Sequence, residues 1–172
     1  TAVAAVDAVA AIDGDRVVAA LAARRGAQAQ LAPAVSAIRQ GGRRLYERVR
    51  DGETVEPPIR DVVIHALEVR GLALPSFSIH VACSKGTFVR ALARDLGHDL
   101  GVGAHLTALR RVQAGRFGLA DAVAPDRLDR EHARDYLVPL ARVIALPHVA
   151  VDDALAEEVE HGRRHPLPAG AV

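Results

Sequence analysis

The sequence predicts an α+β fold in which a mainly antiparallel sheet is flanked by helices. Two observations carry this prediction. Residues 77–83 alternate apolar and polar side chains, as a strand with one buried face does. Residues 88–100 instead place apolar side chains at helical spacing. The chain therefore changes from strand to helix at Lys85-Gly86-Thr87.

The elements that precede this turn follow from local signals. Asp13 or Asp15 is expected to cap a helix whose apolar positions lie between Val17 and Ala22 and which ends before Gly26. Residues 30–58 hold three prolines and two Gly-containing turns, with a short helical turn over residues 45–50. The β-branched stretch 61–70 predicts a strand that pairs with residues 76–83 through a turn at 71–75.

The C-terminal part of the chain is expected to hold one more strand and two helices. Residues 104–111 predict the strand, with glycines at its exit. Helices are predicted over residues 126–137 and 152–160, because Pro139 and Gly162 follow them. We expect a domain boundary near Leu146-Pro147, which would divide the chain into residues 1–145 and 146–172.

Composition bounds the class of protein. With 172 residues, half of them hydrophobic, the chain can bury one sizeable core. Its net charge is only +1, but its basic residues are 21 Arg and one Lys, clustered at 39–50 and 110–116. Genomic base composition can explain a preference for Arg, whereas it does not place residues in clusters.

Several function classes are disfavoured. A single cysteine excludes an internal disulfide and fits a reducing, cytoplasmic compartment. Neither a run of 18 apolar residues nor a signal-peptide pattern is present, so we expect no membrane association. His161 and His165 have a metal-ligand spacing, but Gly162 and Pro166 interrupt a helix there and no third ligand is evident. No metal site is predicted.

The strand-to-helix turn is the most informative segment for function. Gly86 permits a tight turn, and Thr87 is expected to cap the helix that follows. Arg90 lies in the first turn of that helix, where the helix dipole disfavours a cation, and Lys85 stands just before it. Two cations at a positive helix end indicate an anionic partner, a carboxylate or a phosphate. The alternative is a solvated surface arginine.

Three blocks of residues resemble a known family in order and spacing. The first runs from Cys83 to Arg90 and continues through Asp95-Leu96-Gly97 and Gly101 to Arg111. The second comprises Gln30, Pro33, Ser36-Ala37-Ile38, Gly42, Tyr46, Arg50 and Gly52, and the third comprises Leu137 to Leu140, Leu146-Pro147 and Gly162. Together they resemble the bacterial tRNA pseudouridine synthase B (TruB) family over residues 12–168.

This resemblance implies a fold and an activity. The fold would be the mixed, mainly antiparallel sheet of pseudouridine synthases, with residues 146–172 beginning a small PUA-type RNA-binding domain. The activity would be isomerisation of uridine 55 in the tRNA T-loop. The uridine is flipped out, an aspartate attacks the base or sugar, and the uracil rotates and bonds again through carbon. No metal or organic cofactor takes part, and we expect a monomer.

The resemblance also assigns roles to residues. Arg90 corresponds to the basic residue that pairs with the nucleophilic aspartate, and breaking such a buried pair costs about 3–5 kcal/mol. Leu109 corresponds to an apolar residue of the uracil pocket, although a plain core leucine is an equal alternative. Phe88 stands where the family often has Tyr.

A set of cations in and near the segment 29–58 is expected to grip tRNA. The guanidinium of Arg binds phosphate oxygens in pairs, and a Gly-Gly turn lets the backbone approach RNA closely. A solvated charged loop is the alternative for these arginines. The expected RNA contacts are Arg39, Arg43, Arg44, Arg48 and Lys85.

The family's nucleophile is an aspartate in a Gly-x-x-Asp-x-x-Ala-x-Gly-type motif, and no aspartate of this sequence stands in such surroundings. We therefore expect a TruB-like chain without the N-terminal catalytic segment and most of the C-terminal domain, inactive by itself. A second hypothesis is a non-catalytic module that binds or folds tRNA. A third is a protein-interaction domain, which predicts no salt-dependent RNA binding.

Overall fold

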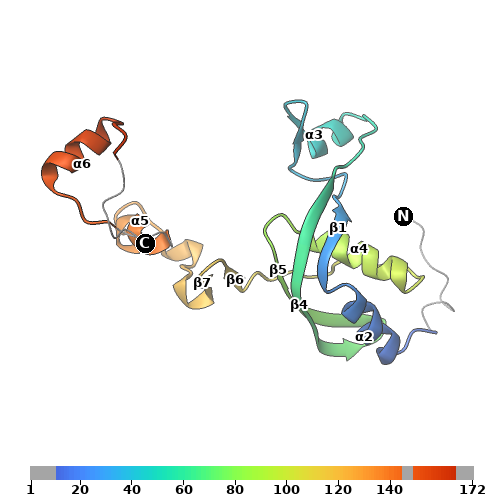
Figure 1. The fold of residues 1–172 in the computed structure, drawn as a ribbon. Coiled ribbons are helices and arrows are strands. Elements are labelled where there is room, and N and C mark those ends of the chain that lie inside the picture. Colours follow the sequence, from blue (N-terminus) through green and yellow to red (C-terminus); the bar gives the residue numbers. More distant parts are fainter. Residues whose placement is uncertain (1–10, 145–148, 166–172) are drawn as a thin grey trace. The chain divides into compact units, whose positions relative to one another are not determined.

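The computed structural model describes residues 11–144 and 149–165, which belong to two compact units, residues 1–110 and 111–172 (Figure 1). The domain boundary expected near Leu146-Pro147 lies outside the described residues, as do the ends of the chain.

The first unit is built on a three-stranded antiparallel sheet. Its strands are β1 (Gly26–Leu31), β4 (Ile59–Ala73) and β5 (Ser76–Cys83), in the order β1-β4-β5. The predicted hairpin is therefore confirmed, although β4 is longer than the predicted strand. Strand β1 was not predicted, because its sequence of Gly, Ala and Gln lacks the β-branched residues that mark strands.

Two helices cover one face of this sheet. Asp13 caps α2 (Gly14–Ala23), as predicted, by accepting a 2.8 Å hydrogen bond from the backbone N–H of Arg16. Helix α4 (Val89–Asp99) follows the turn after β5. None of the described helices is long and apolar enough to cross a membrane.

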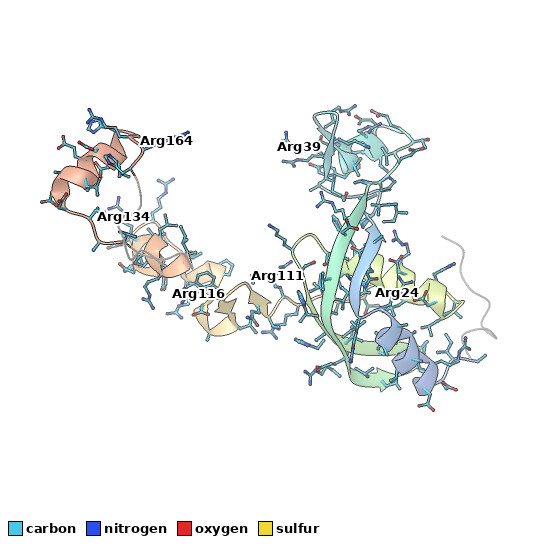
Figure 2. The ribbon with its side chains drawn as sticks, viewed as in Figure 1. Arg24, Arg39, Arg111, Arg116, Arg134 and Arg164 are labelled. Carbon is cyan, nitrogen blue, oxygen red and sulfur yellow. The ribbon has the colours of Figure 1, made fainter. Side chains whose placement is uncertain are left out.

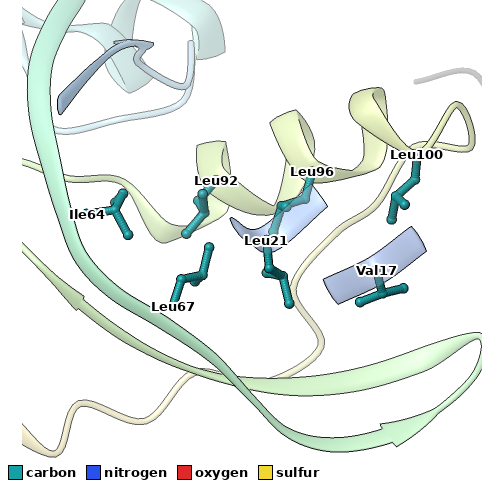
Figure 3. Packing of buried hydrophobic residues seen from close by; sticks show 7 residues of the cluster. All are labelled: Val17, Leu21, Ile64, Leu67, Leu92, Leu96 and Leu100. Atoms are coloured by element: carbon teal, nitrogen blue, oxygen red, sulfur yellow. The ribbon is translucent and has the colours of Figure 1, made fainter. Parts of the chain in front are cut away.

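The core lies between these two helices and the sheet (Figure 3). The half-buried side chains of β5 that were predicted to face inward, among them Phe77 and Cys83, pack against it. Burying such side chains is the main stabilising term for the unit, about 1.5–3 kcal/mol for each large aliphatic side chain. The cluster consists of Val17, Leu21, Ile64, Leu67, Leu92, Leu96 and Leu100.

A β-bulge in β4 explains why its buried positions do not alternate throughout. Val62 and Ile64 are buried, so strict alternation would bury Ala66 next. The next buried side chain is instead Leu67. The pairing with β5 shifts between Ile64 and Ala66, so one extra residue reverses which positions face the core. Simple alternation over 61–70 could not reveal this reversal.

The second unit contains short elements. They are β6 (Gln113–Ala114), β7 (Phe117–Gly118), α5 (Leu140–Val143) and α6 (Asp153–Glu160), with 3-10 turns at Leu119–Asp121, Pro125–Arg127 and Ala133–Tyr136. The guanidinium of Arg116 donates to the carbonyl of Arg142, which ties the β6–β7 hairpin to α5. Helix α6 confirms the helix predicted over 152–160, and Asp152 caps it.

Two predicted elements are wrong. Residues 126–137 do not form one helix: the chain makes two separate 3-10 turns, and Asp129 accepts from the backbone N–H of His132 between them. A hydrogen bond from nearby backbone to an Asp side chain competes with the backbone hydrogen bonds of a helix. Residues 104–111 form no strand, because within the described chain they have no partner strand to pair with.

Candidate functional site

The turn between β5 and α4 is held by its own polar side chains. Gly86 has φ +85°, a conformation that favours glycine. Thr87 does not cap α4 as predicted: its hydroxyl instead donates to the Ser84 carbonyl at 2.9 Å, and the N-cap residue is Phe88. The Ser84 hydroxyl accepts from the backbone N–H of Val63 at 2.9 Å, which fastens the turn to β4.

Arg90 projects from the first turn of α4 into an exposed position. Its Nη2 donates a 2.9 Å hydrogen bond to the backbone carbonyl of Val35. The ion pairs of residues 11–144 and 149–165 do not include Arg90. The guanidinium is thus oriented by one neutral acceptor, and its remaining donors are available to an anion.

The turn also gathers cations. Lys85 is exposed beside Gly86. A Cβ atom added to Gly86 would lie 3.5 Å from Nη1 of Arg60, so the guanidinium of Arg60 lies next to the same turn. Sequence analysis missed Arg60 because it stands on β4, 26 positions from Gly86 in the chain. The arrangement suits an anionic partner such as phosphate.

Leu109 follows α4 in the irregular segment that leads out of the first unit. Its side chain is 66% exposed, so it is not part of the core of this chain. Among the described residues, no polar contact joins Lys85 or Leu109 to the arginines of residues 39–48, which form a separate group on the same unit.

Residues 32–58 form an insertion between β1 and β4. Within it, β2 (Arg39–Gln40) and β3 (Arg43–Arg44) form a hairpin whose two turn residues, Gly41 and Gly42, have φ +61° and +82°. Two central residues with positive φ are the mark of a type I′ turn. Helix α3 (Leu45–Arg50) follows, and Leu45 anchors it with a fully buried side chain.

The insertion contains five arginines and four carboxylates, the latter being Glu47, Asp51, Glu53 and Glu56. Arg43 pairs with Asp51 and, at 2.7 Å, with Glu53. Arg48 also binds Glu53 at 2.7 Å, and its hydrogen bond, followed by the charge of both arginines, lowers the pKa of that carboxyl. These pairs order the arginines on the surface and leave the insertion with an excess of positive charge.

Arg44 and Arg39 are held less firmly by acids. Arg44 donates to the Tyr46 hydroxyl at 2.9 Å, and its guanidinium carbon lies 5.8 Å from the centre of the Tyr46 ring. The side chain of Arg39 extends outward from the insertion and has no hydrogen-bond or ion-pair partner among the described residues (Figure 2). Arg39 is therefore the expected RNA contact that is most available to phosphate.

The structure connects the insertion to α4, which the sequence did not reveal. Three residues of the segment 30–35 bind the start of α4: Gln30 contacts Phe88, Leu31 contacts Arg94, and Val35 contacts Arg90. The second and third of these contacts use backbone carbonyls, which no side-chain pattern can indicate. The insertion, which carries the predicted RNA contacts, is thereby linked to Arg90 through Val35.

The acidic, histidine and cysteine side chains of the described residues lie apart from one another or in pairs. This part of the chain contains no group of three His, Cys, Asp or Glu side chains able to hold an ion. His165 lies 2.8 Å from Glu158, and His161 hydrogen-bonds the carbonyl of Glu157, so each histidine has a local partner.

Two family models together match most of the chain. The N-terminal domain of TruB family pseudouridylate synthase matches residues 1–89, and the C-terminal domain of tRNA pseudouridylate synthase B matches residues 90–145. The chain belongs to the TruB family. The resemblance inferred from the three sequence blocks is thereby confirmed.

Curated relatives agree with this assignment to the TruB family. tRNA pseudouridine synthase B of Mycobacterium sp. (strain KMS) is 43% identical over 155 residues, which cover 88% of this chain and 52% of the relative. The protein of that name from Burkholderia mallei (strain NCTC 10247) is 46% identical over 150 residues, or 85% of this chain and 50% of the relative. The chain spans about half the length of these relatives.

A solved structure shows the same fold. A chain in the crystal structure of a Cbf5-Nop10-Gar1 complex superposes with a TM-score of 0.67 at 22% identity, over 88% of this chain and 45% of that chain. The α+β fold expected for a TruB family member is therefore confirmed.

Proposed function

We propose that this chain is the RNA-gripping and Arg90-bearing portion of a tRNA pseudouridine synthase that acts on uridine 55 of the T-loop. The observation that carries the proposal is the joining of Arg90 to the insertion through the Val35 carbonyl, in a chain of the TruB family. The nucleophilic aspartate would come from outside residues 1–172, since no aspartate of this sequence stands in the family's motif.

Arg90 has the properties that orienting a carboxylate requires. Its guanidinium is planar and permanently charged, and its fork can bind both oxygens of a carboxylate. One of its Nη atoms is already bound by Val35, so the fork is restrained before an anion arrives. Arg90 would hold the nucleophilic aspartate ionised and aimed at the flipped uridine, while exposed Leu109 would contact the uracil.

The insertion would supply the contacts that offset the cost of flipping the uridine, a few kcal/mol. Arg39, Arg43, Arg44 and Arg48 would contact phosphates and loop nucleotides, with Lys85 adding a further phosphate contact at the turn. Arg43 and Arg48 are paired with acids of the insertion, so their charges are already partly neutralised. We therefore attribute most of the phosphate affinity to Arg39 and Arg44. tRNA is the proposed partner, in a cytoplasmic compartment that fits the free thiol of Cys83.

The test is conversion of a T-loop stem-loop RNA by the full-length protein that contains this chain. We expect pseudouridine at the single target uridine and RNA binding that weakens steeply as salt is raised. Binding without conversion would favour the non-catalytic tRNA-binding module. Absence of salt-dependent binding would contradict both functions and favour a protein-interaction domain.

A further inference from the structure

Gln30 is a polar side chain buried in the first unit without an obvious sequence reason. Only 2% of its surface is exposed, although it stands on β1 among alanines and a second glutamine. Burying an amide without hydrogen bonds costs about 1–3 kcal/mol in proteins. Such a residue is retained where its hydrogen bonds are satisfied, and its partners then show what it does.

Both polar atoms of this amide bind one residue. The backbone N–H of Phe88 donates to Oε1 of Gln30 at 2.8 Å, and Nε2 of Gln30 donates to the Phe88 carbonyl at 3.3 Å. The side chain thus engages both backbone groups of a single residue, as a neighbouring strand would. Neither the position nor the direction of the Phe88 backbone can then change without breaking a buried hydrogen bond.

Phe88 is the N-cap residue of α4 and has no side-chain cap of its own. Its carbonyl also accepts the first bond of the helix, from the N–H of Leu92 at 3.0 Å. Gln30 therefore binds both backbone groups of the residue at which α4 begins. Arg90 lies in that turn, two residues further on.

Neighbouring contacts act in the same direction. The Leu31 carbonyl accepts from Nη2 of Arg94 at 2.9 Å, and the Val35 carbonyl accepts from Nη2 of Arg90 at 2.9 Å. The chain that leaves β1 thus lies along the first two turns of α4. Gln30 is the first of these three contacting residues in the chain; it is buried and makes two hydrogen bonds.

We propose that Gln30 is a positioning residue, which fixes the start of α4 and thereby aims the guanidinium of Arg90. The inference rests on the proposed function, in which Arg90 orients the nucleophilic aspartate. It also separates Gln30 from the residues that grip RNA, because an amide that is buried and bonded on both sides is not available to a phosphate or base.

The test uses Gln30→Met in the full-length protein, because Met keeps the side-chain length and removes both hydrogen bonds. Gln28→Met is the matched control: Gln28 is on the same strand, and its amide binds the Arg24 carbonyl instead of the start of α4. We expect turnover of a T-loop stem-loop to fall about 10–100-fold in Gln30→Met, as a small misplacement of a catalytic group does, with RNA affinity changed less than about 3-fold. Gln28→Met keeps wild-type turnover.

Two readouts distinguish positioning from a structural role. The double variant Gln30→Met with Arg90→Lys should turn over no more slowly than Arg90→Lys alone, since Gln30 acts through Arg90. The proposal is overturned if the double variant loses turnover by the product of the two single losses. It is also overturned if Gln30→Met lowers turnover and RNA affinity equally, or leaves turnover unchanged. If Gln30→Met fails to fold, Gln30→Asn replaces it, because the shorter amide withdraws from Phe88, and the same outcomes apply.

The second readout does not depend on activity. In NMR spectra of the RNA-free protein, the chemical shift of the Arg90 side-chain Nε–Hε group should change in Gln30→Met and stay unchanged in Gln28→Met. An unmoved resonance overturns the positioning role even if the enzyme is active. A wild-type protein that makes no pseudouridine refutes the proposed function instead, and the resonance then still decides whether Gln30 aims Arg90.

Discussion

The guanidinium of Arg24 donates two hydrogen bonds of 2.6 Å each to the carboxylate of Asp99, one to each oxygen. This ion pair joins the end of α2 to the end of α4, the two helices that cover the core. Its geometry is the strongest form of surface ion pair. The side chains are 23% and 30% exposed, so solvent screens the pair only in part.

The first prediction concerns this pair and pH. The Arg24 hydrogen bond lowers the pKa of Asp99 in the folded chain below its ordinary value of 3.8. The stabilisation is therefore fully present above about pH 4 and is lost as pH falls through the lowered folded pKa. Asp99→Asn should cost about 1 kcal/mol of unfolding free energy at pH 7.

Urea unfolding of both proteins at several pH values checks this. The difference in unfolding free energy between wild type and Asp99→Asn should narrow as pH is lowered below about 4, since the carboxylate then becomes progressively protonated in the folded chain as well. A gap that stays constant over this range would show that the loss has another cause. Asp153→Asn, in the first turn of α6 in the other unit, serves as a charge-matched control.

A second prediction concerns Gly97, where the backbone after α4 folds back on the helix. The N–H groups of Val102 and Gly103 both donate to the Gly97 carbonyl, at 3.0 and 2.9 Å. A Cβ atom at Gly97 would lie 2.1 Å from the Ala104 nitrogen and 2.3 Å from the Gly103 carbonyl carbon. These are backbone atoms, so the chain that leads to Leu109 must move.

Gly97→Ala should therefore destabilise the first unit by about 3 kcal/mol, although Ala is the better helix former. Thermal unfolding monitored by circular dichroism measures the change. His98→Ala, an exposed position on the same helix, should stay within about 0.5 kcal/mol of wild type. Equal stability of the two variants would contradict the close backbone packing described here.

The third prediction tests which arginine of the insertion meets phosphate. The side chain of Arg39 has no hydrogen-bond or ion-pair partner among the described residues. Arg70, near the C-terminal end of β4, instead pairs with Glu68 at 2.9 Å. Arg39→Ala should weaken T-loop binding and reduce the slope of log affinity against log salt by about one. Fluorescence anisotropy at several salt concentrations measures the slope, and Arg70→Ala should leave it unchanged. An unchanged slope in Arg39→Ala would remove this residue from the interface.

The fourth prediction concerns the 172-residue chain by itself. It should bind a T-loop stem-loop but make no pseudouridine, because none of its aspartates stands in the nucleophile motif. Mass spectrometric or chemical detection of pseudouridine after prolonged incubation checks this. Turnover by the isolated chain would mean that one of its own aspartates attacks the uridine.

The sequence predicted the parts of the fold that strong local patterns specify. The β4–β5 hairpin, α4 and the Asp13 cap of α2 are examples, because apolar periodicity and a capping side chain lie in the same short window. Strand β1 was missed because its small and polar residues are held in the sheet by pairing with β4 and not by their own propensity.

The candidate site was predicted only in part, for a similar reason. Family resemblance assigned a role to Arg90, and the clustering of arginines beside the Gly41-Gly42 turn indicated the RNA contacts of the insertion. The link between Arg90 and the insertion depends on the carbonyl of Val35, and the start of α4 is held by buried Gln30. Backbone acceptors leave no trace in residue identity, and a glutamine gives no sign of burial when alanines surround it. The contacts of the segment 30–35 with α4 are therefore visible only in three dimensions.

The most direct test of the account is Arg90→Lys in the full-length protein, with turnover and T-loop affinity measured on the same preparations. Lys keeps the charge but loses the planar fork, so we predict a fall in turnover of about 100-fold or more with nearly unchanged affinity. Arg70→Lys, at an exposed arginine of β4 that pairs with Glu68, should retain most of the turnover. Equal losses of turnover and affinity in Arg90→Lys would identify Arg90 as a phosphate contact and contradict its role in orienting the nucleophile.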